Sequence, residues 1–175
     1  EGNSGTFREN INPAFELAYW SWGLKKANDW RERMGRERNA DWDRMADQMA
    51  PWPVVNGIYV EAESVLEKDG GHPTQLAAYG FLPASAYLDK EVMRKTLRHV
   101  LDNWDWADTW GWDFPLIAMT AIRLNEPEWA LETLLKSVQK NTYLPNGHNF
   151  QNEGLPLYLP GNGGLLTVVA MMCAG

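Results

Sequence analysis

The sequence is poor in cysteine and in clustered basic residues, and each shortage excludes a class of protein. Cys173 is the single cysteine, so an internal disulfide and a cysteine-based zinc site are both excluded. The net charge is -7, and the stretch richest in arginine, residues 31–38, also carries acidic residues. Nucleic acid is therefore not an expected partner, because no basic surface is dense enough to follow a phosphate backbone.

Long apolar runs are also missing. The most apolar stretch, GLLTVVAMMCAG, is the last 12 residues of the 175-residue chain, whereas a helix needs about 20 residues to span a bilayer. The sequence therefore predicts no membrane span, and it predicts that this stretch is a buried helix that is cut off at its end. The chain also begins with Glu rather than Met. We therefore expect it to be a fragment of a longer protein, for which a missing signal peptide carries no information.

Several catalytic and cofactor motifs are absent. No histidine pair or mixed His/Asp/Glu cluster has the spacing of metal ligands, so no zinc is predicted. The string GNGG lacks both the lysine and the preceding strand of a nucleotide-binding loop. No nucleophile elbow indicates a Ser/His/Asp triad. The sequence predicts no cofactor of any kind.

Tryptophan is the abundant residue. The chain holds ten Trp, and DNWDWADTWGWDFP at 102–115 interleaves four of them with four Asp. Two interpretations compete. The rings either enlarge the core, or they form a sugar-binding surface, because a Trp face stacks on the C–H face of a pyranose ring.

Apolar periodicity and capping residues predict seven helices separated by loops. Asn12 is expected to cap the first helix, with Pro13 at its first position, and Gly35 ends it. Asn39, Asp89 and Asn125 are expected to cap three later helices. Residues 49–64 are expected to be loop or short extended structure. The later helices are expected at 39–49, 74–82, 90–104, 113–124, 126–139 and 163–174.

Two kinds of helix alternate along the chain, which predicts an all-α fold with two layers. The helices at 74–82, 113–124 and 163–174 are apolar on all sides, as expected for an inner layer buried on both faces. Those at 39–49, 90–104 and 126–139 are apolar on one side. Alternating inner and outer helices joined as α-α hairpins describe part of a two-layer toroid. A solenoid is the alternative, although no repeat signature recurs at a fixed period. The long polar loops precede inner helices, so sites are expected at that rim.

Three stretches carry a resemblance to a known family: NPAFELAYWSWGLKKANDWRERMG, DTWGWDFPLIAMTAIRL and NTYLPNGHNFQNEGLPLYLPGNGGLLTVVAMM. They resemble the six-hairpin, (α/α)6-toroid glycoside hydrolases, especially the bacterial α-L-fucosidase-like and maltose-phosphorylase-like branches. The resemblance implies one helical domain over 1–175, forming the C-terminal half of a larger catalytic domain. It also implies cleavage of glycosidic bonds with inversion, an oligosaccharide or glycan substrate, and an extracytoplasmic location. Half a toroid would expose inner helices, so oligomerisation is expected.

Inverting glycosidases need a general acid and a base about 6.5–9.5 Å apart, and the chain offers two candidates for these roles. Glu1 corresponds to the acid of the fucosidase-like branch by the resemblance; the alternative is an irrelevant surface residue. Asp113 is a candidate base or pocket residue; the alternative is a helix cap. Trp110 and Trp112 lie just before the start of the same helix and are candidate sugar contacts.

Further candidate substrate contacts lie in the other loops. Glu61 and Glu63 alternate, so both are expected on one side of an extended segment, where they bind hydroxyls, supply a base or form a solvated edge. His72 and His148 are loop histidines that could donate to a sugar hydroxyl. Amide side chains suit hydroxyl-dense ligands but also stabilise turns, and the candidates among them are Asn149 and Asn162. Two other functions stay open: a non-catalytic sugar-binding relative, and a structural helical-repeat protein whose aromatic residues are core.

Overall fold

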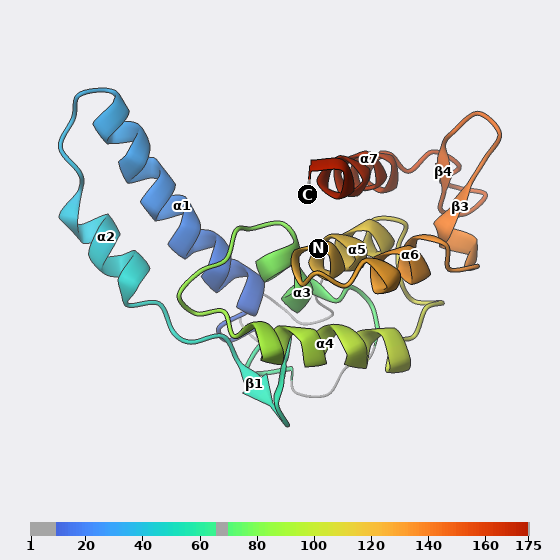
Figure 1. Cartoon of the computed structure of the whole chain (residues 1–175), viewed down its shortest axis with the longest axis horizontal. Helices are drawn as coiled ribbons and strands as arrows, with labels where there is room; N and C mark the ends of the chain where they lie inside the picture. The colour runs from blue at the N-terminus through green and yellow to red at the C-terminus, as the bar shows by residue number, and fades with distance from the viewer. Residues whose placement is uncertain (1–9, 66–69, 175) are drawn as a thin grey trace.

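A computed structural model describes residues 10–65 and 70–174, and within these ranges the protein is mostly helical (Figure 1). This confirms the all-α class. The helices are α1 (Ala14–Arg33), α2 (Ala40–Asp47), α3 (Thr74–Gly80), α4 (Lys90–Asn103), α5 (Asp113–Arg123), α6 (Pro127–Leu134) and α7 (Leu159–Ala174). A single 3-10 turn, η1 (Gln139–Asn141), follows α6.

Side-chain caps start two of the helices where the sequence predicts them. The Asn39 side chain accepts hydrogen bonds from the backbone N–H groups of Asp41 and Trp42 at the start of α2. Asp89 does the same for the first turn of α4. The first helix differs slightly from its prediction. Pro13 is the residue before the helix rather than its first residue, and Asn12 takes a left-handed conformation with φ 49°.

Two helix boundaries were predicted wrongly. The helix expected at 126–139 ends at Leu134, because the Asn141 side chain donates to the carbonyls of Leu134 and Lys136 and so satisfies the end of α6. The helix expected to start at 163 begins at Leu159 instead. Two of its glycines, Gly161 and Gly164, serve close packing rather than a loop: a methyl group on Gly164 would lie 2.5 Å from Cγ of Pro115 in α5.

Two short hairpins interrupt the helices, in β1 (Val54–Val55) with β2 (Ile58–Tyr59), and in β3 (Thr142–Tyr143) with β4 (Asn149–Phe150). Asn56 and Gly57 join the first pair with φ of 51° and 80°. Positive φ at both turn residues is what a type I′ hairpin turn requires, and Asn-Gly supplies it at low cost.

The helix contacts connect the whole described fold. Helices α1, α3, α5 and α7 contact one another in sequence, α2 packs on α1, and α4 and α6 pack on α5. Every residue from Asp113 to Ala121 of α5 is buried, as is 75–80 of α3. The hydrophobic core therefore sits around α3 and α5, with Leu76, Leu97 and Ile117 among its fully buried side chains.

Helix α7 departs from the prediction of an inner helix buried on both faces. Only Gly161 and Val168 are buried, whereas Leu166 is 73% exposed and Leu159 is 64% exposed. In Figure 1, α7 lies next to α5 and apart from α1 and α2, and it contacts α5. Association through this apolar surface stays a prediction. In the described part of the chain, no helix combines the length and apolar character needed to cross a membrane.

Candidate functional site

The loops that lead into α3 and α5 bring His72 and Asp113 together. Asp113 is the first residue of α5, and His72 lies two residues before α3. Each carboxylate oxygen of Asp113 is 3.0 Å from Nδ1 of His72. The backbone N–H of Trp110 donates to Oδ2 of Asp113 at 2.6 Å. Asp113 therefore forms hydrogen bonds both with the loop that precedes it and with His72.

Burial controls the chemistry of this pair. Asp113 is fully buried, and the His72 side chain is 13% exposed. Burial raises the pKa of Asp113 above its ordinary value, while His72, the Trp110 N–H and Lys140 act in the opposite direction. An ionised Asp113 can only accept, so Nδ1 of His72 carries the proton and Nε2 becomes the nitrogen that is open to another partner.

Aromatic rings extend on both sides of His72. The ring centroids are 4.9 Å apart for His72 and Trp112 and 6.2 Å apart for His72 and Trp110. The series continues from Trp112 to Phe81 at 6.3 Å and from Trp110 to Tyr158 at 5.5 Å. We call these five rings the aromatic row. Its members come from both ends of α3 and from the loops that lead into α5 and α7, and they form one surface.

An apolar cleft of about 520 Å³ lies beside the aromatic row, between α3, α5 and α7. Phe81, Trp112, Met119 and Met171 are among the residues that line it. Arg123 also lines the cleft; its Nε donates to the Gly80 carbonyl. This volume is within the range of small-molecule sites, which are mostly apolar with a few polar groups.

Asn149 packs the last loop against the start of α5. It is fully buried, and its side-chain N–H groups donate to the carbonyls of Lys140 and Thr142. A methyl group on Gly111 would lie 2.8 Å from Cγ of Asn149, and one on Gly161 would lie 2.7 Å from the same atom. Gly111 also donates its N–H to Oε1 of Gln151 at 2.9 Å. The two glycines are required because the amide occupies the space of their side chains.

The structure corrects the predicted role of Asp113. A direct base must hold a water molecule, but this carboxylate has no exposed surface and is engaged by His72 and the Trp110 N–H. Asp113 is therefore a residue that positions His72. Trp110 is 37% exposed and Trp112 is half-buried, and the sugar contacts assigned to them stay a prediction. Glu1, the predicted acid, lies outside the described residues.

The prediction that Glu61 and Glu63 share one face is wrong, because the chain turns at 62–65 instead of staying extended. Glu61 is buried and accepts from the Thr74 hydroxyl at 3.3 Å. Glu63 is exposed and accepts from the Asn12 amide at 3.0 Å. Glu61 thus lies near the start of α3, whereas Glu63 stabilises the entry to α1.

Two of the predicted contacts in the last loop, Asn149 and Asn162, stabilise that loop. Asn162 accepts from the Asn149 N–H and donates to the Gly147 carbonyl. His148 lies in the β3–β4 hairpin, where its N–H donates to the Asn146 side chain. The fully buried Asn149 is not presented to a ligand, so turn chemistry is the interpretation that fits Asn149 and Asn162. The sugar contact predicted for the His148 side chain stays a prediction.

Sequence reasoning missed three members of the site. Phe81 and Tyr158 complete the aromatic row, and Lys140 places its Nζ 5.8 Å from the centre of the Trp110 ring. Only Tyr158 carried a signal, since it lies in the loop before the last helix. In residues 10–65 and 70–174, no three His, Cys, Asp or Glu side chains come together as metal ligands would.

The fold and the site define a mostly helical protein with a histidine–carboxylate pair between two tryptophans. Comparison with protein-family models finds no matching family, and a search of curated protein sequences finds no significant match.

Proposed function

We propose that this chain forms part of a carbohydrate-active site that cleaves glycosidic bonds, with the aromatic row as its sugar-binding surface. The observation that carries the proposal is the His72–Asp113 pair held between Trp110 and Trp112. Stacking surfaces beside an oriented hydrogen-bonding group are what a pyranose ring needs, because its C–H faces are apolar and its edges carry hydroxyls.

His72 supplies the oriented polar group. With Nδ1–H directed at Asp113, Nε2 accepts a hydrogen bond from a sugar hydroxyl or from water when the ring is neutral. In an inverting hydrolysis a base removes a proton from water as the water oxygen bonds to the anomeric carbon, and an acid protonates the departing oxygen. We assign the water- or hydroxyl-binding role to His72. Glu1 remains the candidate acid by resemblance to the toroid glycosidases.

The arrangement in a two-layer toroid belongs to the same proposal. The row of contacts from α1 through α3 and α5 to α7, with α2, α4 and α6 outside it, supports that arrangement. Loops that precede inner helices carry His72 and Asp113, which matches the expectation of a site at the loop-rich rim.

A sugar-binding protein without catalysis is the second candidate, and the burial of Asp113 favours it. A carboxylate with no exposed surface and with His72 and a backbone N–H as partners is suited to positioning rather than to proton transfer with water. In this case the aromatic row would bind a glycan and leave it intact.

A His72→Asn variant separates the candidates. Asparagine places an N–H near the position of Nδ1, so the bond to Asp113 survives while the atom corresponding to Nε2 is lost. Wild-type protein should release nitrophenol from one member of a panel of aryl glycosides, and His72→Asn and Glu1→Gln should each abolish that turnover. Turnover that His72→Asn leaves unchanged would contradict the assignment. Tryptophan fluorescence quenching by oligosaccharides without turnover would favour the second candidate. The absence of both turnover and quenching would favour a structural helical repeat.

A further inference from the structure

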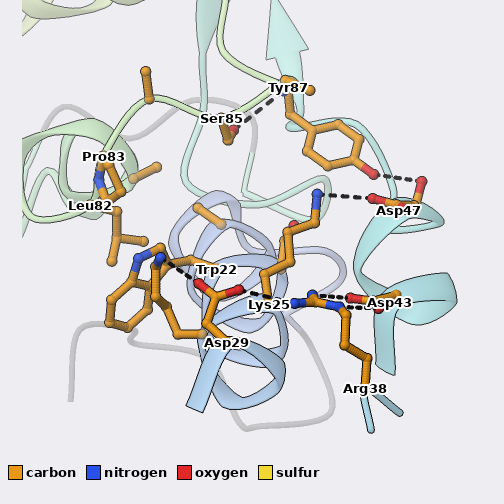
Figure 2. A pocket seen from close by; sticks show the side chains of 16 residues that line it. Trp22, Lys25, Asp29, Arg38, Asp43, Asp47, Leu82, Pro83, Ser85 and Tyr87 are labelled. Carbon is orange, nitrogen blue, oxygen red and sulfur yellow. Dashed lines mark hydrogen bonds and ion pairs between the residues drawn. The ribbon is translucent and has the colours of Figure 1, made fainter. Parts of the chain in front are cut away.

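A second cleft shares no lining residue with the 520 Å³ cleft. It has a volume of about 780 Å³ and is formed by α1, α2 and the loop between α3 and α4. We call it the α1–α2 cleft. Figure 2 shows two unlike walls. Trp22, Leu82 and Pro83 make an apolar wall, and the facing wall carries charged side chains from α1, α2 and the loop between them.

The charges of this polar wall balance. Three cations and three carboxylates line the cleft: Lys25, Lys26, Arg38, Asp29, Asp43 and Asp47. They pair across elements, with Lys25 2.9 Å from Asp47 and Arg38 2.7 Å from Asp43. A net-charged ligand would meet no unbalanced opposite charge here. A neutral ligand with many hydroxyls would find donors and acceptors side by side.

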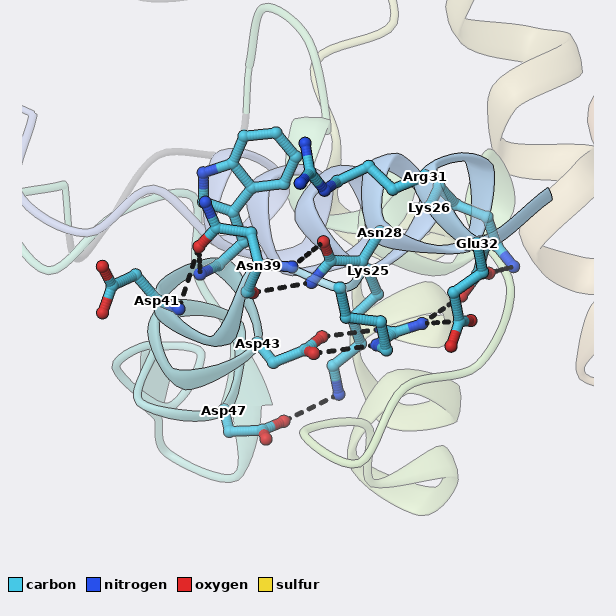
Figure 3. A network of polar contacts seen from close by, with 12 residues as sticks. Lys25, Lys26, Asn28, Arg31, Glu32, Asn39, Asp41, Asp43 and Asp47 are labelled. Atoms are coloured by element: carbon cyan, nitrogen blue, oxygen red, sulfur yellow. Dashed lines mark hydrogen bonds and ion pairs between the residues drawn. The ribbon is translucent and has the colours of Figure 1, made fainter. Parts of the chain in front are cut away.

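The polar wall is held in place before any ligand arrives. Asn28 and Asn39 exchange two hydrogen bonds of 2.9 and 2.8 Å between α1 and the start of α2, as Figure 3 shows. Arg38 bonds Asp29, Glu32 and Asp43 together. The hydrogen bonds from Arg38 lower the pKa of Asp43 to about 2, so this pair stays ionised over the ordinary pH range. A preorganised site loses less conformational entropy on binding.

Aromatic side chains connect the α1–α2 cleft to the aromatic row. The ring centroids are 6.0 Å apart for Trp22 and Tyr19, 5.9 Å for Tyr19 and Phe15, and 6.2 Å for Phe15 and Phe81. Phe81 is already a member of the aromatic row, and Tyr19 is 48% exposed. The rings therefore continue without a break from the first site to the second.

We propose that the α1–α2 cleft is a second carbohydrate site, which takes a neutral sugar unit of the same oligosaccharide chain that the aromatic row binds. The sugar stacks its C–H face on Trp22 and turns its hydroxyls toward the Lys25–Asp47 and Arg38–Asp43 pairs. The choice of sugar as ligand class rests on the proposed function. The two-walled shape and the balanced charge are independent of it.

Fluorine NMR of the full chain labelled with 5-fluorotryptophan tests the two sites separately. The probes are maltohexaose, cellohexaose and xylohexaose, and Trp→Phe variants at positions 22, 110 and 112 assign the signals. The Trp22 signal should shift with at least one probe. Shifts of Trp110 and Trp112 without Trp22 would overturn the second site and leave the proposed function standing. A shift of Trp22 alone would support the second site and count against the aromatic row, and no shift of Trp22 with any probe overturns the second site.

A variant that fills the α1–α2 cleft tests whether the sugar that shifts the Trp22 signal binds there. Ala86 is exposed and lines the α1–α2 cleft, so Ala86→Phe fills it without replacing a charged or core residue. The Kd measured from the Trp22 signal should rise about tenfold or more, as loss of a stacking contact predicts. The matched control is Ala170→Phe on the exposed side of α7, which should leave that Kd unchanged. Equal Kd values for Ala86→Phe and wild type would overturn the placement.

Discussion

Replacing Gly111 by alanine tests the packing that supports the candidate site. The new methyl group would lie 2.8 Å from Cγ of Asn149 and 3.0 Å from the Lys140 carbonyl oxygen, so Asn149 must move. Overpacking costs about 1–3 kcal/mol, and the two hydrogen bonds that Asn149 donates add about 1 kcal/mol each when they are lost. We expect a loss of about 4 kcal/mol in the free energy of unfolding, or roughly 8–16 °C in Tm for a chain of this size.

Calorimetric melting of matched variants measures this loss. Gly163→Ala is the control, because a methyl group there meets nothing within 4 Å and Gly163 lies inside α7. That variant should gain about 0.5–1 kcal/mol from lower chain entropy in the unfolded state. In Gly111→Ala/Asn149→Ala the clash with the Asn149 amide is gone, so the double variant should be more stable than the sum of the single changes predicts. A Tm of Gly111→Ala within 2 °C of wild type, or strict additivity in the cycle, would refute the reasoning.

Three other variants extend the predictions to pH, binding and capping. For Asp113, whose folded pKa is raised above 3.8, the contribution to stability is present below that pH and is lost as pH rises through the folded value. The Tm of wild type relative to Asp113→Asn should therefore fall as pH rises from about 3, and a constant difference would contradict the raised pKa. Trp110→Ala should weaken oligosaccharide binding about two- to tenfold in a fluorescence titration, and unchanged affinity would remove Trp110 from the sugar contacts. Asn39→Ala should lower stability by about 0.5–2 kcal/mol in a urea titration, whereas an unchanged midpoint would show that the cap contributes nothing.

The helices were largely predictable from the sequence, because caps and apolar periodicity act locally. Asn39 and Asp89 cap the helices that they were expected to cap. The boundaries that were missed depend on contacts distant in the chain. Gly164 continues a helix because Pro115 packs against it, and no local pattern in GNGG records that contact.

The candidate site was predictable as a location but not as a set of roles. Trp110, Trp112 and Asp113 stood out from composition alone. The partner of Asp113 is His72, 41 positions away, and only the packing of α3 against α5 brings the two together. For Asn149, the role expected from the sequence differs from the role that the structure shows. An amide in a polar loop suggested a ligand contact, whereas burial between two glycines gives it a structural role.

The amide of Asn149 has a consequence for how this sequence can diverge. Gly111, Asn149 and Gly161 share one small volume, so the three positions are expected to vary together in homologues. A relative with alanine or serine at 111 or 161 should carry a smaller residue at 149, and one that keeps asparagine there should keep both glycines. Substitutions at these positions would then be found as correlated sets, and each single change would be rare.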